Sequence, residues 1–148
     1  MIRLQIGDFD IGAEIAALTK GRHGIGGVVT FTGLVRGGGD GVQAMTLEHY
    51  PGMTEQELTN IEAEANKRWT LDASLIVHRY GKLLPGERIV LVVTAAAHRA
   101  EAFAANEFLV DWLKTKAPFW KNEETASGAR WVESQASDDQ ATERWKKV

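Results

Sequence analysis

Apolar and β-branched residues gather in short runs separated by glycine, proline and polar residues, a pattern typical of strands joined by turns. Strands are predicted where such runs occur, at 28–32, 42–50, 74–80, 88–94 and 130–134. Helices are predicted where apolar residues recur three and four positions apart, at 11–20, from Thr54 onward and at 97–116. The pattern therefore predicts one α+β domain over 1–148, with a mostly antiparallel sheet and helices packed against it.

Local signals predict where several helices begin or end. Thr54 and Glu57 have the spacing of a capping box, which indicates the start of a helix. Pro118 is expected to end the helix at 97–116, because proline cannot continue the backbone hydrogen bonding. Ser137 is expected to cap a short terminal helix.

The composition is that of an ordinary globular protein. The chain has 148 residues, of which 44% are hydrophobic and 25% are charged, and its formal net charge is −3. This charge argues against general affinity for nucleic acid or for an anionic membrane surface. No apolar run approaches the roughly 20 residues that span a bilayer, and the N-terminal residues lack the pattern of a signal peptide. We therefore expect a cytoplasmic protein.

Two residue types limit the chemistry that the chain can perform. The sequence contains no cysteine, which excludes disulfides, zinc–cysteine sites, iron–sulfur ligation and any thiolate mechanism of this chain. The four histidines, His23, His49, His78 and His98, do not share close metal-ligand spacing. We therefore expect no metal and no bound cofactor. His49 and His78 fall in predicted strands, where packed and hydrogen-bonded side chains are expected.

His98 and Arg99 form the first candidate site. They lie where the helix at 97–116 is expected to begin, and cations there oppose the helix dipole unless an anion binds between them and the free amide groups. An anion site and a solvated first turn are both consistent with this position.

Two lysines near the end of the same helix form the second candidate site. Lys114 and Lys121 lie on opposite sides of the break at Pro118, so a chain reversal could bring both amines to one pocket. Phe119 and Trp120 would supply an apolar wall, and a desolvated lysine has a lowered pKa that suits acid–base or nucleophilic work. The alternative is a pair of solvated lysines that favour the helix dipole.

Four segments carry a resemblance to a known family: TFTGLVR at 30–36, LEHYPGM at 47–53, AHR at 97–99 and LKTKAPFWK at 113–121. The WVE run at 131–133 fits the same pattern. Together, over about residues 25–145, they resemble the large, catalytic subunit of molybdopterin synthase.

The resemblance implies an α/β-hammerhead fold and a sulfurtransferase. In this family the large subunit is a homodimer, and a small ubiquitin-like sulfur carrier binds at each end to give a heterotetramer. The carrier's C-terminal Gly-Gly tail, activated as a thiocarboxylate, enters a pocket of the large subunit. Two sulfurs pass to cyclic pyranopterin monophosphate and form the dithiolene of molybdopterin in molybdenum cofactor biosynthesis. A non-catalytic carrier-binding module and a phosphate-ligand binder are the alternatives.

The same resemblance assigns the site residue by residue. Lys114 matches the principal catalytic lysine, which we expect to act as base or nucleophile, and Lys121 matches the second, which we expect to be a fixed cation. The implied substrate-binding residues are Phe31, Leu34, Val35, Arg36, His98, Arg99, Asn122 and Glu123. We expect Arg36, His98 and Arg99 to form one pocket for the substrate phosphate.

Two positions depart from the family pattern. Leu34 stands where a lysine is expected, which removes one anion contact. Gln135 stands where the family pattern has an arginine that reaches the neighbouring subunit, so this chain lacks that arginine's contribution across the dimer. Neither departure removes the lysine pair.

Overall fold

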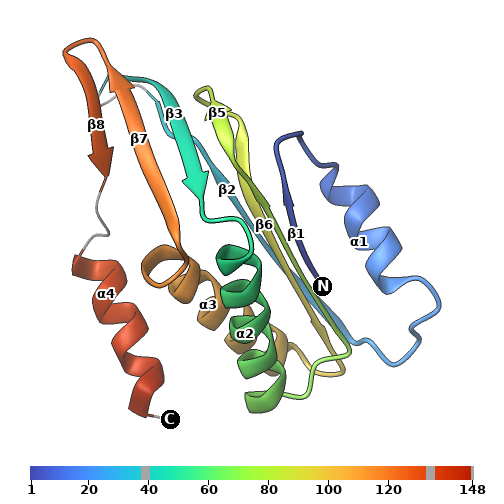
Figure 1. Ribbon diagram of the computed structural model, residues 1–148. Coiled ribbons are helices and arrows are strands. Elements are labelled where there is room, and N and C mark those ends of the chain that lie inside the picture. The colour runs from blue at the N-terminus through green and yellow to red at the C-terminus, as the bar shows by residue number, and fades with distance from the viewer. Residues whose placement is uncertain (38–40, 133–135, 148) are drawn as a thin grey trace.

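The computed structural model describes residues 1–37, 41–132 and 136–147. The strands of this part of the chain are β1 (Ile2–Gln5), β2 (Gly27–Leu34), β3 (Val42–His49), β4 (Ala73–Arg79), β5 (Gly81–Leu83), β6 (Arg88–Ala96), β7 (Phe119–Thr125) and β8 (Gly128–Val132). The helices are α1 (Ile11–Thr19), α2 (Met53–Arg68), α3 (Arg99–Thr115) and α4 (Ala136–Glu143), followed by a 3-10 turn at Arg144–Lys147. They build two four-stranded sheets, in the orders β1-β4-β6-β2 and β5-β3-β7-β8 (Figure 1). The predicted α+β class with mostly antiparallel strands is confirmed.

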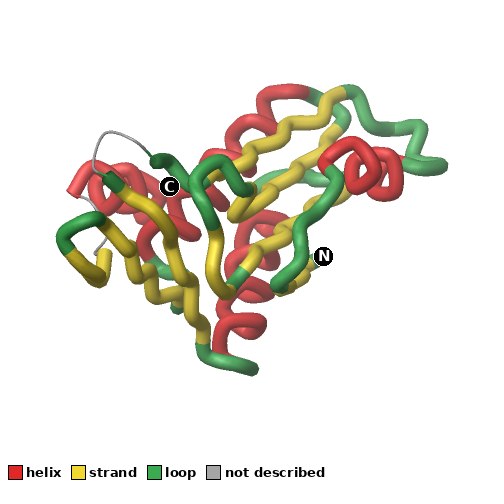
Figure 2. The backbone as a smooth tube through the Cα atoms, turned by 90° about the horizontal axis from the view of Figure 1, so that it is seen from above, coloured by secondary structure: helices red, strands yellow, loops and turns green. Residues whose placement is uncertain are grey.

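Helices cover both faces of the first sheet, which is why its central strands are almost continuously apolar. On one face Ile76 and Val92 pack against Phe108 of α3. On the other face Leu75 and Leu91 pack in a second cluster with α1. Figure 2 shows helices on both sides of the strands.

The direction of α3 decides which end of the molecule holds the site. Near the start of α3, the Thr94 hydroxyl donates to the carbonyl of Ala102 at 2.7 Å. One turn further, the Asn106 side chain donates to the carbonyls of Val29 and Val92 at 3.0 and 3.1 Å. Helix α3 therefore runs back along β6, and its C-terminal end lies beside the start of that strand.

The second sheet contains two strands that the hydrophobic pattern did not predict. Strand β7 pairs antiparallel with β3, with Lys121 opposite Leu47 and Phe119 opposite His49. Its residues 121–124 are polar, so the strand has no apolar run from which it could be predicted. The short β5 places Leu83 opposite Met45, and Leu83 is fully buried.

Helix α2 begins two residues earlier than the capping-box pattern indicated. Its N-cap is Gly52, in the left-handed region at φ 85°, and the Glu55 carboxylate accepts from the Gly52 amide. Thr54 lies inside the helix, fully buried, and its hydroxyl donates to the carbonyl of Tyr50 at 2.9 Å. The predicted Thr54–Glu57 box is therefore wrong, because a glycine supplies the turn that the chain needs before the helix.

Side-chain contacts join α4 and the 3-10 turn after it to the core beside α3. The Trp145 indole donates to the Asp111 carboxylate at 2.6 Å, and its ring packs edge-on against Trp69 and Phe108. The Thr142 and Thr115 hydroxyls are 2.7 Å apart. These contacts hold α4 beside the end of α3. No helix in the described ranges is long and apolar enough to cross a membrane.

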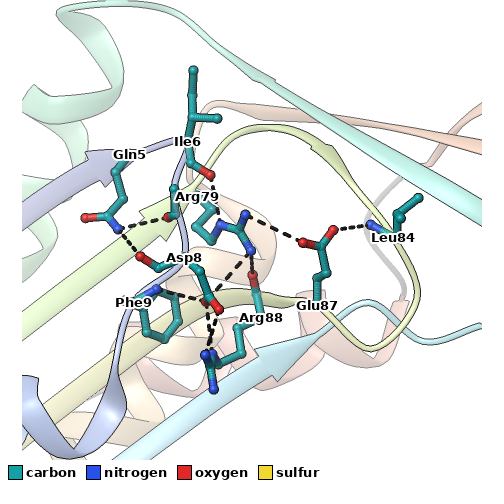
Figure 3. Close-up of polar contacts among 9 residues, drawn as sticks. Gln5, Ile6, Asp8, Phe9, Arg79, Leu84, Glu87 and Arg88 are labelled. Atoms are coloured by element: carbon teal, nitrogen blue, oxygen red, sulfur yellow. Dashed lines mark hydrogen bonds and ion pairs between the residues drawn. The ribbon is translucent and has the colours of Figure 1, made fainter.

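A buried arginine joins the segment after β1 to the turn before β6 (Figure 3). Arg79 donates to the carbonyls of Ile6 and Arg88, each at 3.0 Å, and its side chain is only 8% exposed. The carboxylates of Asp8 and Glu87 lie 3.9 and 3.8 Å from its guanidinium. A bidentate pair between Arg88 and Asp8 lowers the pKa of Asp8 to about 2.

Candidate active site

A cavity of about 290 Å³ lies where the two sheets and the end of α3 meet. Its walls come from β3, β4, α3, β7, β8 and α4, and the residues that line it are Met45, His78, Leu113, Lys114, Thr115, Ala117, Phe119, Lys121, Glu123, Val132 and Asp138. Both predicted catalytic lysines are among them. The sequence places them together because α3 ends at Thr115, the chain reverses within three residues, and β7 starts at Phe119.

An aromatic stack forms one wall of the cavity. The rings of His78 and Phe119 are 3.8 Å apart and nearly parallel, at 15°. Because side chains alternate along a strand, Trp120 lies on the opposite face of β7 and packs edge-on against Tyr50 at 4.1 Å. The apolar wall expected from Phe119 and Trp120 is therefore made by Phe119 and His78 instead.

The two lysines differ in exposure, in the opposite sense to the one expected. Lys114 is exposed, in the last turn of α3, whereas Lys121 is half-buried. Burial lowers the pKa of Lys121, and the nearby positive charge of Lys114 lowers it further. Asp138 and Glu123 act against this shift, but the lowering prevails. The desolvated amine of this site is thus Lys121.

Two acidic side chains, Glu123 and Asp138, line the same cavity, and Glu123 is paired with an arginine. Glu123, two residues after Lys121 on the same face of β7, forms an ion pair with Arg130 of β8 at 3.0 Å. Asp138 reaches the cavity from α4, and nothing in the sequence pattern singled it out. Asn122, which the family resemblance also indicated, lies on the other face of β7, outside the lining residues.

The predicted residues at the end of β2 and just after it lie near this end of the molecule but outside the cavity. Val35 is buried, and its amide donates to the carbonyl of Glu87 at 2.9 Å. The neighbours Leu34 and Arg36 are exposed. Phe31 lines a separate shallow hollow with Phe103 and Asn106.

His98 and Arg99 lie at the opposite end. Arg99 opens α3 and Lys114 lies near its close, which separates them by roughly 22 Å along the helix axis at about 1.5 Å per residue. In β2 the residue beside Ala96 is Gly27 and the residue beside Arg88 is Leu34, so the length of the strand also separates Arg36 from His98. One copy of the chain does not bring Arg36, His98 and Arg99 into one pocket.

Comparisons with known proteins agree with this architecture. The model of the family described as MoaE protein matches residues 4–116. The chain belongs to the MoaE protein family. A relative from Ralstonia nicotianae, named molybdopterin synthase catalytic subunit, is 57% identical over 146 residues, which is 97% of this chain and 83% of the relative.

Solved MoaE-family structures have the same fold. The molybdopterin biosynthesis MoaE protein of Burkholderia ambifaria MC40-6 superposes with a TM-score of 0.85 at 53% identity, covering 99% of this chain and 97% of that one. Molybdopterin synthase of Staphylococcus aureus superposes with a TM-score of 0.80 at 31% identity, covering 88% of this chain and 95% of that one. The family resemblance inferred from the four sequence segments is thereby confirmed.

Of the two positions at which this MoaE-family chain departs from the family pattern, the structure describes Leu34 but not Gln135. Leu34 is 54% exposed and is not among the residues that line the cavity. Gln135 lies outside the described residues. Within the described ranges, no three His, Asp or Glu side chains are grouped closely enough to hold a metal ion.

Sequence reasoning treated His78 as a packed histidine and missed that it lines the cavity. It is packed, as expected, and its Nδ1 lies 2.8 Å from the carbonyl oxygen of Arg79. The signal that could have found it is a histidine directly after the apolar run 75–77, within the same predicted strand, since a polar group in a buried strand needs a hydrogen-bonding or functional reason to be there.

Proposed function

We propose that this chain is the catalytic subunit of a molybdopterin synthase and that it works as a sulfurtransferase. The observation that carries the proposal is the cavity in which Lys114 and Lys121 meet, in a chain of the MoaE family. Its substrates are the C-terminal thiocarboxylate of a small ubiquitin-like carrier and cyclic pyranopterin monophosphate. The product is the dithiolene of molybdopterin.

The size of the cavity supports a carrier that enters by its tail. A volume of about 290 Å³ is at the small end for ligand pockets and is far too small for a folded domain. A Gly-Gly tail has no side chains, so its backbone can approach the walls closely. The name "catalytic subunit" carried by the curated relatives supports a second subunit in the working enzyme.

The two lysines divide the chemistry according to their burial. Once a carrier sulfur is bonded to the pterin carbon, water adds to the acyl carbon of the tail, and an oxyanion develops there. Lys114 supplies positive charge to that oxyanion. Lys121, whose pKa is lowered, accepts the proton from the attacking water. The acyl C–S bond then breaks, the sulfur keeps its electron pair on the pterin, and the carrier leaves as a carboxylate.

This division reverses the roles expected from the sequence, and the reason is physical. A general base must be neutral before it can accept a proton, and burial favours the neutral form of an amine. Lys121 is the more buried of the two lysines. Glu123 remains a candidate for substrate contact because it lines the cavity, while the substrate-binding roles of Phe31, Leu34, Val35 and Asn122 stay predictions.

The distance between the residues expected to bind the substrate phosphate supports a homodimer within a heterotetramer. Arg36 lies near the lysine cavity, while His98 and Arg99 lie at the far end of the same copy. If all three serve one phosphate, as the family resemblance implies, a second copy has to supply His98 and Arg99. We propose this arrangement, with one carrier bound at each end of the dimer.

Reconstitution tests the whole proposal. The purified chain is incubated with thiocarboxylated carrier and cyclic pyranopterin monophosphate, and mass spectrometry detects the dithiolene product. Product formation that requires all three components is the expected result. Carrier binding without product would favour a non-catalytic binding module instead. A cytoplasmic location is part of the proposal, and cell fractionation tests it.

A further inference from the structure

His78 is a buried, polar wall residue of the lysine cavity whose chemistry the proposed reaction does not yet use. Only 5% of the residue is exposed, and it lies on β4, one of the two central strands of the first sheet. Its ring stacks on Phe119 and lines the cavity together with Lys114 and Lys121.

The contacts of the ring define which nitrogen carries the proton. Nδ1 lies 2.8 Å from the carbonyl oxygen of Arg79, and a carbonyl can only accept, so Nδ1 is the donor. The ring is also neutral, because burial lowers the pKa of His78 to about 3, and the charges of Lys121 and Lys114 act in the same direction. Nε2 therefore carries a lone pair.

That lone pair has no protein partner within the described chain. The Nδ1 contact with Arg79 is the one hydrogen bond that the ring makes there. Lys121 on β7, Lys114 on α3 and His49 on β3 act on the ring through their charges, and the carboxylates of Glu123 and Asp138 line the same cavity. None of these groups bonds to Nε2. His78 as a residue is more than nine-tenths buried, but Nε2 is not among the enclosed polar atoms that lack a partner, which places this nitrogen at the surface of the cavity. An unpaired acceptor that a side chain so deeply packed presents to a cavity indicates a ligand that donates.

We infer that His78 is a ligand-binding residue of this cavity, whose Nε2 accepts a hydrogen bond from an uncharged N–H group of the molecule held beside Lys114 and Lys121. This inference rests on the proposed function, because that function supplies two ligands with such a group. The amide of the carrier's terminal glycine is adjacent to the thiocarboxylate, and the pterin ring has N–H groups of its own. The anionic end of either ligand pairs with Lys114, and the neighbouring N–H pairs with His78.

The test is equilibrium binding by titration calorimetry at neutral pH, with the carrier in its unreactive carboxylate form and, separately, with cyclic pyranopterin monophosphate. His78→Phe keeps a flat ring on Phe119 and removes the acceptor. We expect His78→Phe to weaken the binding of one ligand by roughly tenfold to a hundredfold, because a donor of that ligand then lies in the cavity without its acceptor. Weakened carrier binding identifies the tail amide, and weakened pterin binding identifies the ring N–H.

The matched control is His49→Phe. His49 also lies near Phe119, with ring centroids 6.3 Å apart, but it is not among the residues that line the cavity. Its substitution should leave both affinities within about twofold. His78→Gln, which can return an acceptor to the position of Nε2, should restore most of the lost affinity. Unchanged affinity of His78→Phe for both ligands, or equal losses in His49→Phe, would overturn the inference.

A second measurement uses the unaltered protein and does not depend on how the variants fold. The ¹⁵N resonance of His78 Nε2, assigned by its absence in His78→Gln, should show an unprotonated nitrogen and should move on saturation with the ligand that His78→Phe loses. A resonance that stays in place with both ligands bound would contradict the inference alone. Failure of the unaltered protein to bind either ligand would instead contradict the proposed function.

Discussion

The imidazole of His78 lies flat on the phenyl ring of Phe119, with centroids 3.8 Å apart and 15° between the planes. His78 belongs to the first sheet and Phe119 to the second, so this stack joins the two sheets at the cavity. The stack also keeps water from one face of the imidazole, which is consistent with the dominant effect of burial on its pKa.

Replacing Phe119 by leucine should destabilise the protein and loosen the cavity wall. The change removes the ring contact with His78 and leaves unfilled space, and we expect a loss of about 1–3 kcal/mol in the free energy of unfolding. Urea denaturation measures it. Phe103→Leu is the control, since Phe103 is 60% exposed and its change should fall within about 0.5 kcal/mol. Equal losses in the two variants would show that the stack adds no stability.

Arginine substitutions should separate the two lysines. Lys121→Arg keeps the positive charge but cannot release its proton near neutral pH, so its activity should fall about as far as that of Lys121→Ala, by at least roughly a hundredfold. Lys114→Arg should keep more activity than Lys114→Ala, because its role is electrostatic. Single-turnover dithiolene formation by the four variants is the measurement. Near-normal turnover by Lys121→Arg would remove its assignment as base.

The pH dependence of the reaction should report the environment of Lys121. Its pKa lies below the ordinary value of 10.5, so the rate should rise with pH through a midpoint lower than 10.5. Lys114→Gln removes a neighbouring positive charge and should move the midpoint to higher pH. Glu123→Gln removes a negative charge and should move it to lower pH. Rate–pH profiles of the three proteins test this, and a midpoint that neither substitution moves would assign the titration to another group.

The same lowered pKa has a consequence for stability. Because the folded state holds the Lys121 proton less tightly than the unfolded state does, the free energy of unfolding contributed by this group rises with pH between the folded and the unfolded pKa. Below that window the charged amine destabilises the fold. Lys121→Met should therefore unfold at a higher temperature than the unaltered protein at neutral pH. A lower Tm would mean that the amine makes stabilising contacts that outweigh its burial.

Arg79 should be needed for the fold more than its carboxylate partners are. Arg79→Met leaves the carbonyls of Ile6 and Arg88 without their donor, and we expect a loss of about 2–4 kcal/mol. Asp8→Asn should lose less than about 1 kcal/mol, since Asp8 is more than half exposed. With a folded pKa of about 2 against an ordinary 3.8, the Asp8 contribution is present above pH 4 and disappears as pH falls toward 2. Urea denaturation at neutral and acidic pH measures both effects, and similar losses in the two variants would contradict this ranking.

Mixing two inactive variants should test the proposed phosphate site across the dimer. Arg36→Ala and Arg99→Ala each damage every site of their own homodimer. After subunit exchange, a mixed dimer has one intact site and one doubly altered site, so about a quarter of the sites should recover. Dithiolene formation by the mixture, against each variant alone, is the measurement. No recovery after proven exchange would show that Arg36 and Arg99 of different copies do not share a site.

Much of the fold follows from local sequence signals, and the exceptions have identifiable causes. The strands at 28–32, 74–80 and 88–94 and the helices at 11–20 and 97–116 were predicted because apolar periodicity reports directly on burial. Strand β7 was not, because its alternating residues are mostly polar and face a cavity rather than a core. The start of α2 was misplaced because Gly52 and Glu55 cap it, and the Thr54–Glu57 spacing is a coincidence of composition.

By itself, the sequence determined the α+β class, the approximate position of most helices and strands, the absence of thiol chemistry, and the family to which the lysine segment belongs. These depend on residue type and on short spacing along the chain. The tertiary structure decided that Lys121 rather than Lys114 is desolvated, that Phe119 rather than Trp120 faces the cavity, and that His78 joins them. It also separated Arg36 from His98 and Arg99 within one copy. Burial and proximity depend on which strands become neighbours, and His78 and Lys121, far apart in sequence, meet only because two sheets pack against the end of one helix.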